Sequence, residues 1–228
     1  MRLLALGAHP DDIEIFMFGA LAAWKAMGAE LAFAIATDGS KGGTLPSDEL
    51  RRVRRAEATK AAAHLGVTPR FLDFPDGELV ADAALIGALR ALIAETDPDL
   101  VVTHAPNDYH GDHRALSDGV RIATSFRAPV LWADTLRGAG FAPTHYVDIT
   151  AHAALKETAI REHVSQEPER FVAWAQQLAA FRAGEANGPK GSAAEAYRFE
   201  PQFPFVDIRD LLPPAPPVSP VHDRSKPR

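Results

Sequence analysis

The sequence predicts an α/β fold, namely a three-layer α/β/α Rossmann-like domain with a mostly parallel sheet and a C-terminal α/β elaboration. Two observations support this prediction. Short apolar segments of strand length alternate with longer helical segments through the first 130 residues, a rhythm typical of a parallel sheet with helices on both faces. The chain has 228 residues, of which 46% are hydrophobic and 24% charged, enough for one large soluble core.

The individual elements can be placed from their apolar runs and their stop signals. We expect strands at residues 2–8, 30–37, 70–74 and 100–103, and helices at 16–27, 48–65, 82–95 and 114–125. Gly28 and Gly66 stop the first two helices, and Ser47 caps the start of the second. Farther along we expect strands at 130–133 and 145–148, helices at 151–164 and 169–183, and a loop at 185–193.

The C-terminal end differs in composition from the rest. Residues 213–228 are rich in proline and offer few apolar side chains to bury. Such a segment gains little from packing, so we expect a disordered tail there. We therefore expect a single domain over residues 1–212.

Composition excludes several classes of function. The chain has no cysteine, which rules out disulfides, thiolate zinc sites and cysteine nucleophiles. A net charge of -6 argues against nucleic acid as a partner. No apolar run approaches the roughly 20 residues of a membrane span, and no signal-peptide pattern is present. We expect a cytoplasmic homo-oligomer without a membrane or nucleic-acid partner.

Two polar clusters follow predicted strands. The first is AHPDD at residues 8–12, and the second is NDYHGDH at residues 107–113. Ligands of open parallel sheets bind beyond the carboxyl ends of the strands, at the point where the strand order reverses. The first and fourth strands are neighbours at that point, so we expect the two clusters to face each other.

His and Asp side chains in such an arrangement can bind a metal ion. Catalytic zinc has three protein ligands and keeps a fourth position for water or substrate. His9 and Asp12 lie three residues apart on one turn and can reach one ion, and His113 can supply the third ligand from the opposite loop. We therefore predict a zinc site of His9, Asp12 and His113.

The remaining polar residues of the two clusters suggest the rest of a catalytic site. Asp11 would lie beside the metal without binding it and could take a proton from the attacking water. His110 would be a second imidazole near the reaction, and Asp112 could orient a histidine by a hydrogen bond. Each cluster alone could also be an ordinary turn or helix cap. Together, at two converging strand ends, they favour a metal site.

Two other enzyme classes are disfavoured. No GxGxxG follows the first strand, as a dinucleotide-binding fold would require. No GxSxG is present for a serine hydrolase of the α/β class.

AHPDD at 8–12 and HGDH at 110–113 resemble the paired signatures of the PIG-L/LmbE family of zinc-dependent de-N-acetylases. Other short segments are similar as well, at residues 37–39, 54–58, 65–67, 74–79 and 163–166. The resemblance covers roughly residues 2–200. It implies removal of an acetyl group from the nitrogen of an amino sugar or its conjugate, with a small N-acetylated sugar as the binding partner.

The resemblance also implies roles for individual residues. Zinc, one Zn²⁺ per chain, would be bound by His9, Asp12 and His113, although His and Asp ligands also suit Fe²⁺ or another divalent metal. The general base would be Asp11. The reacting amide would be polarised or protonated by His110, with Asp112 supporting it.

One position departs from the family pattern. Many members carry Glu directly after the two aspartates, whereas here Ile13 precedes Glu14. A hydrophobic residue followed by Glu also occurs in members that deacetylate N-acetylglucosaminyl-malate for bacillithiol synthesis. That conjugate is therefore one candidate substrate, and the role of Glu14 stays open.

Two further residues are candidate substrate contacts. Arg54 belongs to a basic run, and the resemblance implies an Arg near this helix start that meets sugar hydroxyls; the alternative is a solvated helix face with ion pairs such as Arg54 with Glu57. Asp76 follows the third strand at the binding end, in a turn where Asp is also common for local reasons. His104 could support the site or belong to the core, and packing is the favoured role of His163.

Two rival functions remain on this sequence. The same metal centre could hydrolyse an ester or phosphoester bond, or the fold could be a non-catalytic sugar-binding protein. The intact set of predicted ligands and base disfavours the second, because a binding protein would be free to lose Asp11.

Overall fold

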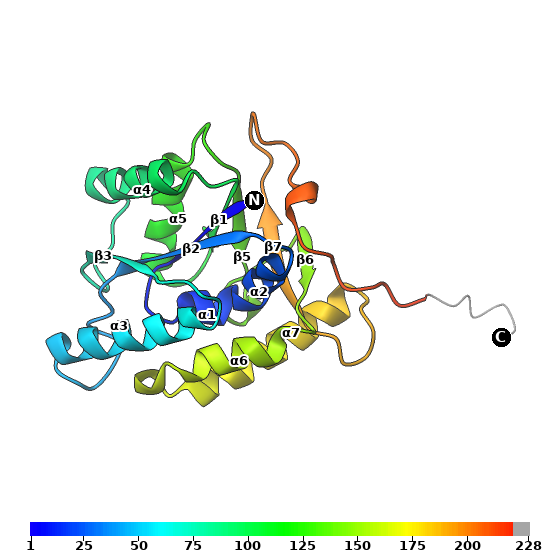
Figure 1. The fold of residues 1–228 in the computed structure, drawn as a ribbon, viewed down its shortest axis with the longest axis horizontal. Coiled ribbons are helices and arrows are strands. Elements are labelled where there is room, and N and C mark those ends of the chain that lie inside the picture. Colours follow the sequence, from blue (N-terminus) through cyan, green and yellow to red (C-terminus); the bar gives the residue numbers. More distant parts are fainter. Residues whose placement is uncertain (221–228) are drawn as a thin grey trace, which may run out of the picture.

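The computed structural model describes residues 1–220, in which a seven-stranded sheet lies between two layers of helices (Figure 1). The strands are β1 (Arg2–Gly7), β2 (Glu30–Thr37), β3 (Arg70–Phe74), β4 (Leu100–His104), β5 (Val130–Ala133), β6 (His145–Asp148) and β7 (Ala194–Phe199). They are ordered β3-β2-β1-β4-β5-β7-β6. The pairs from β3 to β5 are parallel, and β7 is antiparallel to both of its neighbours. The predicted fold class is confirmed.

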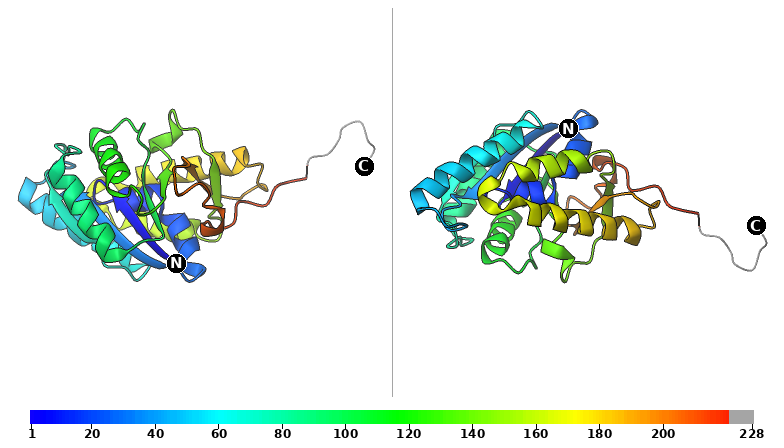
Figure 2. Two further views of the ribbon diagram at one scale, coloured as in Figure 1. Left: turned by 90° about the horizontal axis from the view of Figure 1, so that it is seen from above. Right: turned by 90° about the horizontal axis from the view of Figure 1, so that it is seen from below.

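The helices form one layer on each face of this sheet (Figure 2). They are α1 (Asp12–Phe16), α2 (Phe18–Ala26), α3 (Ser47–Ala63), α4 (Ala83–Thr96), α5 (Gly111–Ala123), α6 (Ala153–Arg161) and α7 (Pro168–Glu185). Alternate residues of a strand point to opposite faces. Leu4 packs in one core with Leu89 of α4 and Leu116 of α5, whereas Leu3 packs in the other with helices that include α2 and α3.

The strand order reverses between β1 and β4. β2 and β3 continue on one side of β1, and β4 and β5 lie on its other side. Leu3 of β1 pairs with Leu100 of β4, so the two strands end side by side. As predicted, the loops that follow them meet at one edge of the sheet.

The helix expected at residues 16–27 is two helices, α1 and α2, separated at Met17. The reason is a carboxylate from β7. Glu195 accepts hydrogen bonds from the backbone N–H groups of Gly19 and Ala20, the free donors of the first turn of α2. Gly19 permits this approach, because a Cβ there would lie 2.9 Å from Glu195 Oε1.

Other boundaries also differ from the expectation. The α3 helix begins at Ser47 with Pro46 before it, so Ser47 is not its cap. The α5 helix begins at Gly111 rather than at residue 114, because His110 caps it through a bond from the Asp112 N–H. Helix α6 spans only Ala153–Arg161 and is followed by a short 3-10 turn, Val164–Gln166. Gly28 and Gly66 have positive φ and end their helices as predicted.

The C-terminal segment differs from the expected disordered tail in its described part. The backbone N–H of Asp148 donates to Pro214 O, and that of Ser219 donates to Asn187 O, so residues 213–220 contact the body of the protein. The prediction of disorder at residues 221–228 lies outside the described residues. A single domain over 1–212 stays a prediction. Among residues 1–220, no helix is long and apolar enough to cross a bilayer.

Candidate active site and metal centre

A cleft with a volume of about 320 Å³ opens where β1 and β4 end. Its walls include every residue predicted for the site except Asp112, which lies directly behind His9. Helix α1 starts at Asp12 and helix α5 at Gly111, so both polar clusters lie where a strand passes into a helix. The topology therefore brings together residues that are about a hundred positions apart in the chain.

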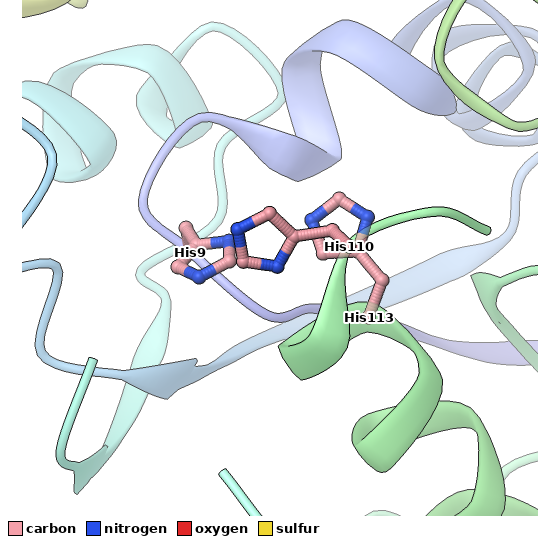
Figure 3. Close-up of side chains that lie close together, drawn as sticks. All are labelled: His9, His110 and His113. Carbon is pink, nitrogen blue, oxygen red and sulfur yellow. The ribbon is translucent and has the colours of Figure 1, made fainter. Parts of the chain in front are cut away.

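The three predicted metal ligands are buried and adjacent. Asp12 contacts both imidazoles, with Oδ2 3.2 Å from His9 Nδ1 and Oδ1 3.3 Å from His113 Nε2. His110 completes the group, and its ring centroid lies 4.7 Å from that of His9 and 4.7 Å from that of His113 (Figure 3).

Several sets of donor atoms here could hold a metal ion. Three sets each bring their donor atoms within 4.8 Å of one another: His9–His110–His113, Asp12–His104–His113 and His9–Asp76–Asp112. The predicted ligands His9, Asp12 and His113 are drawn from across these sets and do not themselves form one of the three.

The charges of the site also fit a cation. Burial by itself would lower the pKa of His9, but Asp12 and hydrogen bonds to Asp112 and Asp76 outweigh it and raise this pKa to about 12. The pKa of His113 rises to about 9 for similar reasons, with Asp12 and Asp108 outweighing burial. The carboxylates therefore stabilise positive charge at these two imidazoles. A divalent metal ion bound here could supply that charge in place of the protons on His9 and His113.

Asp11 lies beside this group in different surroundings. Its carboxyl is buried, and burial raises its pKa against the opposing effect of Arg54, whose Nη2 lies 3.3 Å from Asp11 Oδ1. The backbone at Asp11 has φ 145°, a conformation that a side chain with a Cβ rarely adopts. Strain of this kind persists only where the surrounding structure imposes it, and it concentrates at functional sites.

The structure links Asp112 to His9 rather than to the side chain of His110. Asp112 Oδ2 lies 3.1 Å from His9 Nε2 and accepts a hydrogen bond from the Gly77 N–H, which ties the loop after β3 to the site. His110 is instead contacted by the backbone of Asp112, whose N–H donates to His110 Nδ1 at 3.2 Å. Because Nδ1 accepts, the neutral ring of His110 carries its proton on Nε2.

The two candidate substrate contacts line the cleft and also hold its walls together. Arg54 is buried, and its guanidinium donates to Gly39 O at 3.0 Å and to Pro10 O at 3.1 Å. Asp76 accepts a bond from the Lys41 N–H and lies 3.3 Å from His9 Nε2. The alternative of an Arg54–Glu57 pair is not found.

Glu57 instead accepts from both the N–H and the hydroxyl of Ser165. Next to it, the Gln166 side chain donates to Ser165 Oγ and lines the cleft. His163 is buried with Nε2 3.2 Å from Oε2 of Glu14, so the glutamate after Ile13 pairs with the C-terminal HVSQ segment. Packing was the expected role of His163, and its pairing with Glu14 was not predicted.

Two polar residues of the site, Asp108 and His104, had no definite role predicted from the sequence. Asp108 Oδ1 lies 3.4 Å from His113 Nδ1 and accepts a bond from the His110 N–H. His104 accepts a bond from the Ala8 N–H and stacks on His113 at 3.7 Å, and burial lowers its pKa to about 4. In the sequence, the only sign of a role for Asp108 was its position within NDYHGDH. Its pairing with His113 could not be predicted, because it depends on where α5 starts.

Comparison with known proteins identifies the family of this chain. Residues 4–124, more than half of the chain, match the PIG-L family, described as GlcNAc-PI de-N-acetylase. The chain belongs to the PIG-L family.

Proteins similar to this chain include named deacetylases. The diacetylchitobiose deacetylase of Thermococcus kodakarensis is 30% identical over 189 residues, 74% of this chain and 71% of that protein. The 1D-myo-inositol 2-acetamido-2-deoxy-alpha-D-glucopyranoside deacetylase of Mycolicibacterium vanbaalenii is 27% identical, covering 72% and 80%. The solved N,N'-diacetylchitobiose deacetylase of Pyrococcus horikoshii has a TM-score of 0.78 at 25% identity and covers 92% of this chain and 88% of that one.

Proposed function

We propose that this protein is a metal-dependent hydrolase that removes the N-acetyl group of an amino sugar or amino-sugar conjugate. The observation that carries the proposal is the convergence, in one cleft, of a buried carboxyl at Asp11, a neutral imidazole at His110 and the His9, Asp12 and His113 donor atoms. Membership of the PIG-L family supports the reaction type.

We propose zinc as the metal, held by His9, Asp12 and His113, one ion per chain. Buried His nitrogens and Asp oxygens are suitable zinc ligands, and the same ligands also suit iron. When bound, zinc lowers the pKa of water towards about 7 and polarises a carbonyl. Asp112 behind His9 and Asp108 behind His113 would fix the orientation of these two rings.

Asp11 would take the proton from the attacking water. Its carboxyl is not among the three donor sets, and the raised pKa makes it a stronger base than an exposed aspartate. The contact with Arg54 holds the carboxylate in place, because the guanidinium is itself fixed by two backbone carbonyls.

His110 would donate a hydrogen bond from Nε2. Its Nδ1 is occupied by the Asp112 N–H, so Nε2–H is the free donor of the neutral ring. That N–H can stabilise the oxygen of the tetrahedral intermediate by a hydrogen bond. The proton that Asp11 takes from the water would pass to the leaving amine, which must be protonated to depart, and Asp11 would return to its carboxylate form. Burial and the charges of His113 and His9 lower the pKa of His110, which keeps the ring neutral before the reaction.

The cleft would bind the sugar through its polar wall. Arg54, Asp76, Lys41 and Gln166 lie on it, and such side chains can meet sugar hydroxyls. A volume of about 320 Å³ lies at the lower end of the range for small-molecule sites. Diacetylchitobiose, an N-acetylglucosaminyl-inositol conjugate and N-acetylglucosaminyl-malate are the candidate substrates. Cytoplasmic location and homo-oligomer formation stay predictions.

A substrate panel tests this function. The purified protein is assayed for acetate and free amine with N-acetylglucosamine, the three candidate conjugates and a phosphate ester, with and without a chelator. We expect acetate release from at least one N-acetyl sugar and its loss with chelator. Hydrolysis of the phosphate ester alone would favour the rival metallophosphatase. Sugar binding with no turnover, in the presence of added zinc, would favour a binding protein.

A further inference from the structure

Part of the cleft lining is apolar. Ile15 and Phe16 of α1 and Leu136 of the loop after β5 lie there. Behind them is a second cavity, with a volume of about 30 Å³, whose walls include the same three residues together with Trp174 and Leu178 of α7. The three shared side chains therefore separate the cleft from the second cavity.

The apolar part of the lining contacts histidines of the candidate metal site. The ring of Phe16 meets His104 edge-on at 5.1 Å and His113 at 5.6 Å between centroids. The carbonyl carbon of an N-acyl sugar carries two substituents, the sugar nitrogen and the alkyl part of the acyl group. A sugar needs polar partners such as Arg54 and Asp76, whereas an alkyl group gains by leaving water for an apolar surface.

We propose that Ile15, Phe16 and Leu136 form the acyl subsite and that Leu136 closes its far end, so that acetyl is preferred to longer acyl groups. This inference rests on the proposed function and specifies its substrate class. Beyond Leu136 the second cavity holds only about 30 Å³, room for about one or two waters. A longer chain therefore has no space unless Leu136 is removed.

The position of Leu136 is fixed by its own loop. Arg182 holds Asp134, with Nε 2.6 Å from Oδ2 and Nη2 3.2 Å from Oδ1. The Thr135 hydroxyl donates to Ala139 O at 2.8 Å, which closes the turn that carries Leu136. The backbone that carries Leu136 is therefore held by a bidentate ion pair on one side and a closed turn on the other.

Four of the five charged groups around the second cavity are paired with one another. Lys156 Nζ lies 2.6 Å from Glu195 Oε1, and Arg182 is paired with Asp134. The fifth, Arg137, lies over the Trp174 ring with its Cζ 4.0 Å from the ring centroid. An alkyl chain that entered this space would therefore not have to break an ion pair. Truncation of Leu136 should therefore let additional methylene groups of the acyl chain enter the second cavity without the cost of exposing them to unpaired charges.

The test is an acyl-length series. Hydrolysis of N-acetyl-, N-propionyl- and N-butyrylglucosamine is measured as kcat/KM for the unmodified protein and for Leu136→Ala. One methylene that fits poorly in an apolar pocket costs about 10-fold or more. We expect such a fall along the series for the unmodified protein, and a butyryl-to-acetyl ratio at least about 10-fold higher in Leu136→Ala.

Two further variants make the result specific. Leu178→Ala enlarges the second cavity without touching the cleft, so its ratio should match that of the unmodified protein. Leu136→Phe should lower the propionyl-to-acetyl ratio. Each ratio is taken within one preparation, so partial unfolding cancels. The ratios also separate acyl selectivity from a general loss of activity.

The inference is overturned if Leu136→Ala leaves the acyl ratios unchanged. It is also overturned if that variant alters only the preference between diacetylchitobiose and N-acetylglucosamine, since Leu136 would then face the leaving sugar. If the protein releases acetate but Leu136→Ala leaves the acyl ratios unchanged, the acyl subsite is refuted and the proposed function stands. No acetate from any N-acetyl sugar would refute both this inference and the proposed function.

Discussion

At the scale of single residues, Asp11 and Asp12 are neighbours in the chain with different surroundings. Asp12 lies among three imidazoles, and their charges outweigh burial and hold its pKa well below its usual range. Asp11 faces Arg54, and burial raises its pKa. Two identical carboxyls can therefore perform different tasks, one as a metal ligand and the other as a base.

Replacing each of these aspartates by asparagine separates the two tasks. Asp11→Asn keeps size and hydrogen bonding but cannot accept a proton, so it should retain zinc and lose kcat by about 10²–10⁴-fold. Asp12→Asn should lose metal, with partial recovery in excess zinc. Metal content and acetate release of both variants check this. Metal loss in Asp11→Asn with retention in Asp12→Asn would reverse the assignment.

Asp108 provides a second test at this scale. Its carboxylate faces His113 Nδ1 at 3.4 Å, where it can orient the ring and raise its basicity. Asp108→Ala should weaken zinc binding by about 10–100-fold, measured by competition with a chelator. Asp118→Ala, at an exposed position on α5, the helix that carries His113, is the matched control and should bind zinc normally. Equal zinc affinity in the two variants would show that Asp108 does not support zinc binding through His113.

At the scale of elements, the break between α1 and α2 depends on β7. Glu195 accepts from Gly19 N, from Ala20 N and from the Tyr197 hydroxyl, and it pairs with the buried Lys156. One strand residue thus fixes the start of α2 and the end of α1, the helix that carries Asp12. The pairing also joins the C-terminal strands to the catalytic half of the protein.

Removing this carboxylate should be costly. Glu195→Ala leaves Lys156 buried without its partner and should lower the free energy of unfolding by about 3–5 kcal/mol in denaturant titrations. The control is Glu95→Ala, which breaks the exposed pair with Arg70 and should change stability by less than about 1 kcal/mol. Equal effects of the two substitutions would show that the Glu195 contacts contribute little.

The sequence alone predicted the elements whose signals are local. Strands such as Arg70–Phe74 and the helix stops at Gly28 and Gly66 follow from apolar runs and glycine. The strand β7 (Ala194–Phe199) was not predicted, because AEAYRF lacks β-branched residues and an apolar alternation. Its Glu195 is buried only because Lys156, α2 and Tyr197 surround it, and no local pattern reports such partners.

The same limit applies to the site. The motifs placed His9, Asp12 and His113 together because strand order follows from the alternating pattern, and the structure does bring them into contact. The roles given to these residues stay predictions. The pairing of Asp112 with His9, rather than with His110, depends on the rotation of α5, which the one-dimensional pattern does not define.

At the scale of the whole molecule, the C-terminal segment contributes contacts. Pro214 O accepts from the Asp148 N–H, and Ser219 exchanges two hydrogen bonds with Asn187. At about 1 kcal/mol for each of these bonds, truncation after Leu212 should lower Tm by about 6–12 °C. Truncation after Pro220 removes none of the described contacts and should leave Tm unchanged. Equal Tm values for both truncated forms and the full chain would contradict docking.

Removal of the acetyl group should depend on a metal ion bound by His9, Asp12 and His113. The most direct measurement is a metal titration of chelator-treated protein, with acetate release from the best N-acetyl sugar as the signal. We predict no activity without metal and a linear rise that levels off at about one zinc per chain. Full acetate release by protein shown to be metal-free would contradict the proposed metal-dependent mechanism.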